Sequence, residues 1–205
     1  MSAAGTKVLG VAKGEVGNRE QPDGSNKGPK VNVYKAETWL PASEGWPWCV
    51  AFWQWCIHHG LGKKFPYPTA AVEQLEDYAR SHKLHTSHPE VGDAACFHGD
   101  HITFVASVVG SEFQGLGGNQ GNMVKVSSYS RAGVSTFVST AQVRIHLGLP
   151  PVTVKRPRYE VVRGEGGQKK TIYLGSSIDK AMGRAERALR AGAGVVKVKK
   201  AKPAA

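Results

Sequence analysis

The sequence is short of cysteine, of long apolar runs and, at one end, of acidic charge. Only 3 of the 205 residues are cysteine. This number is too small and odd for a disulfide framework, so we expect reduced thiols made in a cytoplasm. No stretch approaches the roughly 18 consecutive apolar residues of a membrane-spanning helix. The first residues lack a basic segment followed by a long apolar one, so we expect no secretory signal peptide.

Acidic residues are scarcest where basic residues are densest. Residues 151–205 carry 14 Lys or Arg against 4 Asp or Glu, whereas residues 1–150 carry 13 against 12. The net charge of +11 therefore comes almost entirely from the C-terminal quarter. This asymmetry favours a polyanionic partner for that segment: nucleic acid, an anionic membrane or an acidic cell-wall polymer. A basic segment that only keeps the protein in solution is the alternative.

Tryptophan and cysteine are concentrated between residues 46 and 60. Pro47 suits the first turn of a helix and Gly60 suits its end, and the residues between them are apolar on nearly all sides. The pattern predicts a buried helix with Cys49 in its first turn. Free backbone N–H groups and the helix dipole favour a thiolate there, which is the form that a cysteine nucleophile uses. An inert buried cysteine is the alternative.

The first 150 residues otherwise divide into helices followed by strands. Apolar spacing predicts helices at 6–16 and at 68–79, and turn-forming residues predict a polar loop at 17–29. Short apolar segments joined by glycine-containing turns then predict antiparallel strands at 94–98, 101–109, 112–116, 123–129 and 134–138. Helices first and antiparallel strands afterwards make the domain α+β.

A thiol nucleophile needs a base, and the base needs a group that fixes its tautomer. His101 begins the longest predicted strand, and Asn119 follows the end of the next one. In a hairpin, the start of the first strand lies beside the end of the second, so Asn119 is expected near His101. A half-exposed strand histidine and an ordinary turn asparagine are the alternatives.

Metal ligands offer a rival interpretation. One candidate set of zinc ligands for a hydrolase is Cys96, His98 and His101. A second group, in a predicted surface loop, is His82, His85 and His88. Loop 18–28 offers oxygen ligands for calcium, although their spacing is not that of an EF-hand. We expect no required metal, because a zinc site would leave Cys49 without a role. Inhibition by alkylating Cys49, but not by EDTA, separates the two hypotheses.

Several blocks together resemble the CHAP domain, a cysteine, histidine-dependent amidohydrolase/peptidase found in bacteriophage endolysins and bacterial wall hydrolases. In chain order the blocks are Trp48-Cys49-Val50-Ala51-Phe52, Gly92-Asp93, Asp100-His101-Ile102-Thr103-Phe104-Val105 and Gly117-Gly118-Asn119-Gln120-Gly121-Asn122. The resemblance covers roughly residues 5–148. It implies a papain-like fold with Cys49 as nucleophile, His101 as general base and Asn119 as the orienting residue. Many members carry Glu two residues before that Asn, where this sequence has Gly117.

The resemblance also implies what the protein acts on. It points to a peptidoglycan hydrolase of the endolysin type, either an N-acetylmuramoyl-L-alanine amidase or an endopeptidase, with no required cofactor. We expect substrate contacts from Trp46, Trp48 and Gln120, and structural roles for Cys56 and Cys96. We further expect a monomer that remains in the host bacterial cytoplasm until lysis and then reaches the cell wall. A virion-associated enzyme is the alternative location.

The sequence predicts three parts: a catalytic domain at 1–148, a linker at 149–157 and a small basic unit at 158–200. Apolar spacing in the basic unit predicts a ββαβ order, with strands at 158–162, 170–174 and 195–198 and a helix at 178–189. Such a unit is near the limit of independent stability. It would hold the enzyme on an anionic cell wall, or it would be a nucleic-acid-binding or virion-assembly module that carries the hydrolase.

Overall fold

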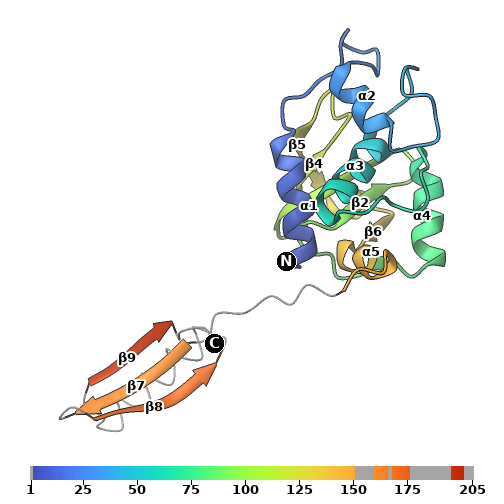
Figure 1. Cartoon of the computed structure of the whole chain (residues 1–205). Coiled ribbons are helices and arrows are strands. Elements are labelled where there is room, and N and C mark those ends of the chain that lie inside the picture. The colour runs from blue at the N-terminus through green and yellow to red at the C-terminus, as the bar shows by residue number, and fades with distance from the viewer. Residues whose placement is uncertain (1, 151–158, 166–167, 176–194, 201–205) are drawn as a thin grey trace. The chain divides into compact units, whose positions relative to one another are not determined.

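The computed structural model describes residues 2–150, 159–165, 168–175 and 195–200 (Figure 1). The chain separates into two compact units, residues 1–152 and 153–205. The first is a mixed α+β domain with helices and a six-stranded antiparallel sheet, as the sequence predicts. Across the described part of the chain, no helix combines the length and apolarity needed to cross a bilayer.

The elements of the first unit follow one another as helices, then strands, then a final helix. The helices are α1 (Ala3–Gly14), α2 (Pro29–Lys35), α3 (Cys49–Leu61), α4 (Val72–Ser81) and α5 (Thr140–His146), with a short 3₁₀ helix at Arg131–Gly133. The strands are β1 (His85–Thr86), β2 (Ala94–Phe97), β3 (His101–Val109), β4 (Glu112–Gly117), β5 (Lys125–Ser130) and β6 (Thr136–Val138). The order in the sheet is β1-β6-β2-β3-β4-β5, so β2 and β3 are central.

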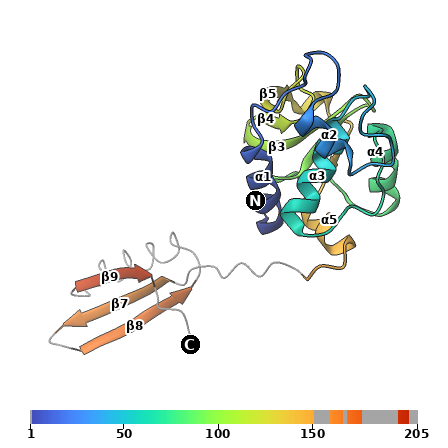
Figure 2. The same ribbon diagram turned by 45° about the horizontal axis from the view of Figure 1, so that its top comes forward.

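Helix α3 lies between α1 and α4 and packs against the sheet (Figures 1 and 2). It begins at Cys49, with Trp48 as its N-cap, and ends at Gly62, which has a left-handed φ of 77°. Both predicted ends are therefore wrong by about two residues. Gly60 lies inside the helix because α1 packs there: a Cβ on Gly60 would lie 2.7 Å from the Cα of Val8.

Two apolar clusters stabilise the sheet, one on each face. The larger contains the buried side chains of α1, α3 and α4 together with Ile102, Phe104 and Leu116 of the sheet. The smaller is built on Ala95, Val105 and Phe113. This division follows the alternation of side chains along β3, because neighbouring strand residues point to opposite faces.

Four short elements escape the sequence prediction: α2, α5, β1 and the 3₁₀ helix. Helix α2 has seven residues, too few for apolar periodicity to identify it. Its structure depends on tertiary packing instead, because the ring of Tyr34 contacts those of Trp48, Phe52 and Trp55 at centroid distances of 5.7, 5.1 and 5.2 Å. Residues 85–86, predicted as loop, pair with β6.

The described strands of the second unit are β7 (Tyr159–Glu165), β8 (Gln168–Gly175) and β9 (Val195–Lys200). They form an antiparallel sheet in the order β8-β7-β9. The three strands occupy the segments in which the sequence predicts strands. The helix predicted at 178–189 lies outside the described residues.

Candidate active site

Cys49 lies in the first turn of α3 at the floor of a surface groove of about 500 Å³. Trp39 and Trp46 line this groove from the segment before α3, Ala71 lines it from the start of α4, and Asp100 lines it from the β2–β3 turn. The residue Cys49 is only 4% exposed. A substrate in the groove would therefore reach the sulfur from one side.

Burial raises the pKa of the Cys49 thiol to about 11, and the carboxylate of Asp100 adds to the increase. The backbone N–H groups of Ile102, Val50 and Cys49 face the sulfur and oppose this increase without cancelling it. A thiol with this pKa is protonated at neutral pH, so burial acts against the thiolate that a helix start favours. The partial charge at a helix start does not outweigh desolvation of the sulfur here.

The imidazole of His101 is held by an amide. Its Nε2 lies 3.2 Å from Oε1 of Gln120, and the hydroxyl of Tyr129 donates to the same oxygen at 2.6 Å. The amide nitrogen of Gln120 donates to the carbonyl oxygens of Lys125 and Gly115, which fixes the orientation of the amide. Because Oε1 only accepts, Nε2 carries the proton and Nδ1 keeps its lone pair.

Burial lowers the pKa of His101, while the hydrogen bond to Gln120 and the charge of Asp100 act in the opposite direction. The net shift favours a neutral imidazole at pH 7, the form in which Nδ1 accepts a proton. The N–H group at the Cys49 sulfur belongs to Ile102, the residue after His101. The backbone that carries His101 therefore lies beside the sulfur, while the His101 ring stacks with those of Phe97 and Tyr129. The hydrogen bonds of the described residues do not include one between sulfur and imidazole; such bonds often tighten only when substrate binds.

The amide that contacts the imidazole is that of Gln120, which corrects the expectation that Asn119 takes this position. Asn119 has a left-handed φ of 58°, which interrupts the strand-like alternation of side chains. With the amide turned so that both of its atoms have partners, its nitrogen donates to Glu20 at 3.1 Å and its oxygen accepts from the N–H of Trp48 at 3.3 Å. Asn119 thus fastens the loop after β4 to the start of α3.

Gly117 leaves the space that Gln120 uses. A Cβ at Gly117 would lie 3.2 Å from Oε1 of Gln120 and 2.9 Å from Oγ1 of Thr103. The amide of Gln120 therefore occupies space that any side chain at position 117 would fill. The sequence indicates an amide partner for His101 in the pair Asn119-Gln120. Which of the two amides contacts the imidazole depends on the backbone conformation of Asn119.

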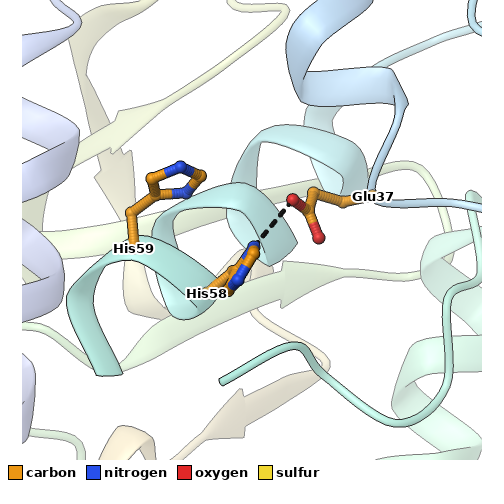
Figure 3. Close-up of side chains that lie close together, drawn as sticks. All are labelled: Glu37, His58 and His59. Atoms are coloured by element: carbon orange, nitrogen blue, oxygen red, sulfur yellow. Dashed lines mark hydrogen bonds and ion pairs between the residues drawn. The ribbon is translucent and has the colours of Figure 1, made fainter. Parts of the chain in front are cut away.

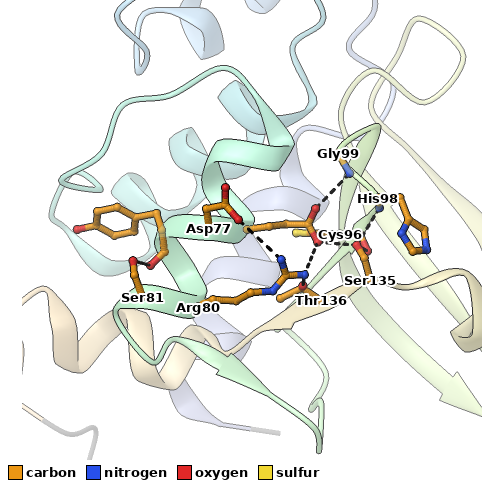
Figure 4. A network of polar contacts seen from close by, with 10 residues as sticks. Asp77, Arg80, Ser81, Cys96, His98, Gly99, Ser135 and Thr136 are labelled. Carbon is orange, nitrogen blue, oxygen red and sulfur yellow. Dashed lines mark hydrogen bonds and ion pairs between the residues drawn. The ribbon is translucent and has the colours of Figure 1, made fainter.

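A buried polar network fixes the turn that leads into His101 (Figure 4). The carboxylate of Glu76, on α4, accepts from the N–H of Gly99 at 3.1 Å and from the hydroxyl of Ser135. The hydroxyl of Ser135 accepts in turn from the N–H of His98 at 2.8 Å. Arg80 lies 3.6 Å from the same carboxylate. No local pattern in the sequence marks Glu76, because its partners are distant in the chain.

The predicted substrate contacts differ in position. Trp46 is half-buried and lines the groove, and Nζ of Lys35 lies 4.4 Å from its ring centroid. Trp48 is fully buried and its indole N–H donates to Glu20 at 2.9 Å, so direct contact with a substrate is excluded in this structure. Gln120 is 5% exposed and contacts His101 instead of lining the groove.

The side chains of the two alternative zinc sites do not come together in the described part of the chain. Cys96 is buried, whereas His98 is exposed and has a φ of 46°, which ends the strand alternation that would align the two. Neither the Cys96 set nor the three loop histidines is a cluster of ligand atoms among the residues that the structure describes. In loop 18–28, one carboxylate oxygen of Glu20 accepts from the indole N–H of Trp48 and the other accepts from the backbone N–H of Asn26. Both oxygens therefore already make structural hydrogen bonds.

In comparisons with known proteins, no family model, curated protein or solved structure matches the chain.

The rate at which iodoacetamide alkylates Cys49 should keep rising with pH towards about 11. The thiolate is the reactive form, and its fraction increases tenfold per pH unit below the pKa. Intact-mass and peptide-mapping spectrometry over pH 6–10 measures this rate, with buried Cys56 and Cys96 as internal controls. A rate that levels off near pH 7 would show a thiolate–imidazolium pair instead.

Proposed function

We propose that the first unit is a cysteine-dependent amidohydrolase that cleaves an amide bond of bacterial peptidoglycan. The observation that carries this proposal is the arrangement at the starts of α3 and β3. The Cys49 sulfur lies at the N–H of Ile102, the adjacent His101 is fixed by Gln120, and a groove opens over the thiol. The resemblance of the same blocks to CHAP domains supports peptidoglycan as the substrate and a papain-like arrangement.

The neutral thiol and neutral imidazole define the order of proton transfers. As the sulfur attacks the carbonyl carbon, Nδ1 of His101 takes the thiol proton and a C–S bond forms. The first N–H groups of α3 have no acceptor within the helix, so they are donors for the oxyanion. Asp100 raises the pKa of His101 and thus stabilises the imidazolium.

The imidazolium then protonates the leaving amine, and the C–N bond breaks to leave a thioester on Cys49. The imidazole next takes a proton from water, whose oxygen attacks the thioester carbonyl. Cleavage of the C–S bond releases a carboxylic acid, and the imidazolium returns its proton to the sulfur. The acid then loses its proton to solvent and becomes a carboxylate.

Mass spectrometry of digested peptidoglycan tests the proposal. Purified sacculi incubated with the full chain should yield new amino ends that are absent with Cys49→Ala. New N-terminal alanine would identify an N-acetylmuramoyl-L-alanine amidase, whereas glycine or another residue would identify an endopeptidase. If the wild type and the alanine variant leave identical fragments, the chain does not cleave peptidoglycan through Cys49.

The basic second unit supports two proposals about partners. Its excess of positive charge suits an anionic wall polymer, which would hold a monomeric lysin on the wall after release from the host cytoplasm. The same charge suits nucleic acid, which would favour a virion-associated protein carrying the hydrolase. A salt-sensitive mobility shift with DNA, absent with wall polymer, would favour the second.

Gln120→Ala should lower kcat/KM about tenfold or more, because the imidazole loses the acceptor that holds its tautomer. Gln120→Glu keeps an acceptor and adds a negative charge beside the ring. It should raise the pKa of His101 and move the acid limb of the pH profile to higher pH.

The matched control for Gln120→Ala is Gln114→Ala, on the exposed part of β4, where the amide bonds only to Ser128 among the described residues. This control should keep full activity. If Gln120→Ala were fully active and Asn119→Ala inactive at unchanged stability, the orienting role would belong to Asn119.

A further inference from the structure

A cluster of side chains that carry metal-ligand atoms lies at the opposite end of α3 from Cys49. Glu37, His58 and His59 each present a ligand atom, and the three atoms lie within 4.8 Å of one another (Figure 3). In the part of the chain that the structure describes, this is the one such group of three. Its residues take no part in the site around Cys49.

The orientation of His59 is fixed by its surroundings. Its Nδ1 lies 2.9 Å from the carbonyl oxygen of Trp55, one helical turn earlier, and its ring stacks on the Trp55 indole at 4.1 Å between centroids. A carbonyl only accepts, so Nδ1 carries the proton and Nε2 keeps a lone pair. Histidines that bind metals are commonly held in this way, with the second ring nitrogen donating to a backbone carbonyl.

His58 and Glu37 supply the other two donors. Nδ1 of His58 lies 2.9 Å from Oε1 of Glu37, and the Glu37 side chain is only 9% exposed. Two ligand atoms about 2.0–2.1 Å from one zinc ion can be separated by this distance, so an ion can replace the proton between them. Nζ of Lys64 lies 3.4 Å from Oε2 of Glu37, but its side chain is 62% exposed and free to withdraw.

We propose that Glu37, His58 and His59 form a binding site for a divalent transition-metal ion of the zinc class. Two imidazole nitrogens and one carboxylate oxygen suit zinc better than magnesium or calcium, which prefer oxygen ligands alone. The carboxylate of Glu15 acts electrostatically on His59 and adds negative charge nearby. Exposure of His59 leaves room for water as a further ligand.

The site would connect two parts of the first unit. Glu37 follows α2 and comes two residues before Trp39, whose side chain lines the groove over Cys49. His58 and His59 belong to the last turns of α3, the helix that begins at Cys49. A bound ion would therefore fasten the segment that carries one groove wall to the nucleophile helix.

Isothermal titration calorimetry with zinc chloride tests the site on the full chain after removal of metal with EDTA. The chain carries Cys49→Ser, so that the thiol in the groove binds no zinc. We expect saturation at one equivalent, affinity at least about tenfold weaker in His59→Ala and in Glu37→Gln, and tighter binding in Lys64→Gln. Magnesium should give no saturable heat.

His88→Ala, which removes an exposed histidine outside the cluster, is the matched control and should bind zinc as the parent does. Circular dichroism verifies that each variant is folded, and a zinc-dependent rise in the melting temperature should be lost in His59→Ala. Zinc binding that is absent, or that keeps its affinity in both His59→Ala and Glu37→Gln, would overturn the proposal. Failure here would leave the proposed hydrolase activity untouched.

Discussion

Cys49→Ala is expected to reduce the release of peptidoglycan fragments at least about 10³-fold. The sulfur is the only atom at the floor of the groove proposed to form a covalent bond to the substrate. The side chain is buried and small, so its truncation should leave the fold intact. Loss of turbidity of a cell-wall suspension, compared at equal folded concentration, measures the effect.

Cys56→Ala is the matched control for this experiment. Cys56 is fully buried in the same helix, two turns from Cys49 and outside the groove lining. Its truncation should cost about 1 kcal/mol of stability and leave the activity of the folded protein unchanged. A Cys49→Ala variant that clears the suspension at the wild-type rate would remove the thiol from the mechanism.

Gly118→Ala is expected to produce the largest loss of stability. A Cβ at this position would lie 2.5 Å from Cζ3 of Trp48 and 2.6 Å from Cβ of Phe52, closer than real Cβ contacts allow. Both neighbours are fully buried, so neither has space to withdraw. Overpacking of this kind costs about 3 kcal/mol, which corresponds to a melting temperature about 6–12 °C lower.

The same substitution should also reduce activity. Gly118 lies two residues before Gln120 and packs against the helix that carries Cys49, so a side chain there would displace both. Differential scanning calorimetry and the fragment-release assay measure the two effects together. Gly10→Ala is the control: nothing lies within 4 Å of a Cβ there, and alanine favours the interior of α1. That variant should melt slightly above the wild type. Equal melting of Gly118→Ala and the wild type would contradict the close packing.

The sequence was sufficient for the α+β class, for most strands and for the place of Cys49 at the start of a buried helix. Those predictions depend on the spacing of apolar residues and on the positions of proline and glycine at the ends of helices and strands. Both signals are local in the sequence. The ends of α3 were missed because Gly60 is required by contact with α1 instead of by a helix end. That contact joins residues distant in the chain and leaves no local signal.

The candidate site was predicted less completely for a related reason. Asn119 and Gln120 carry the same functional group at neighbouring positions, and only the left-handed backbone at Asn119 directs the second amide to His101. The protonation state of the Cys49 thiol could also not be predicted from the sequence. Position at a helix start favours a thiolate, whereas the surrounding burial that overrides it is a property of the folded domain.

A neutral resting thiol has a consequence for the durability of the protein. With a pKa of about 11 for Cys49, only about one molecule in 10⁴ carries a thiolate at pH 7. Peroxide and disulfides react with the thiolate, so oxidation of Cys49 to a sulfenic acid is slow while the groove is empty. Burial of the sulfur thus protects the Cys49 thiol from oxidation.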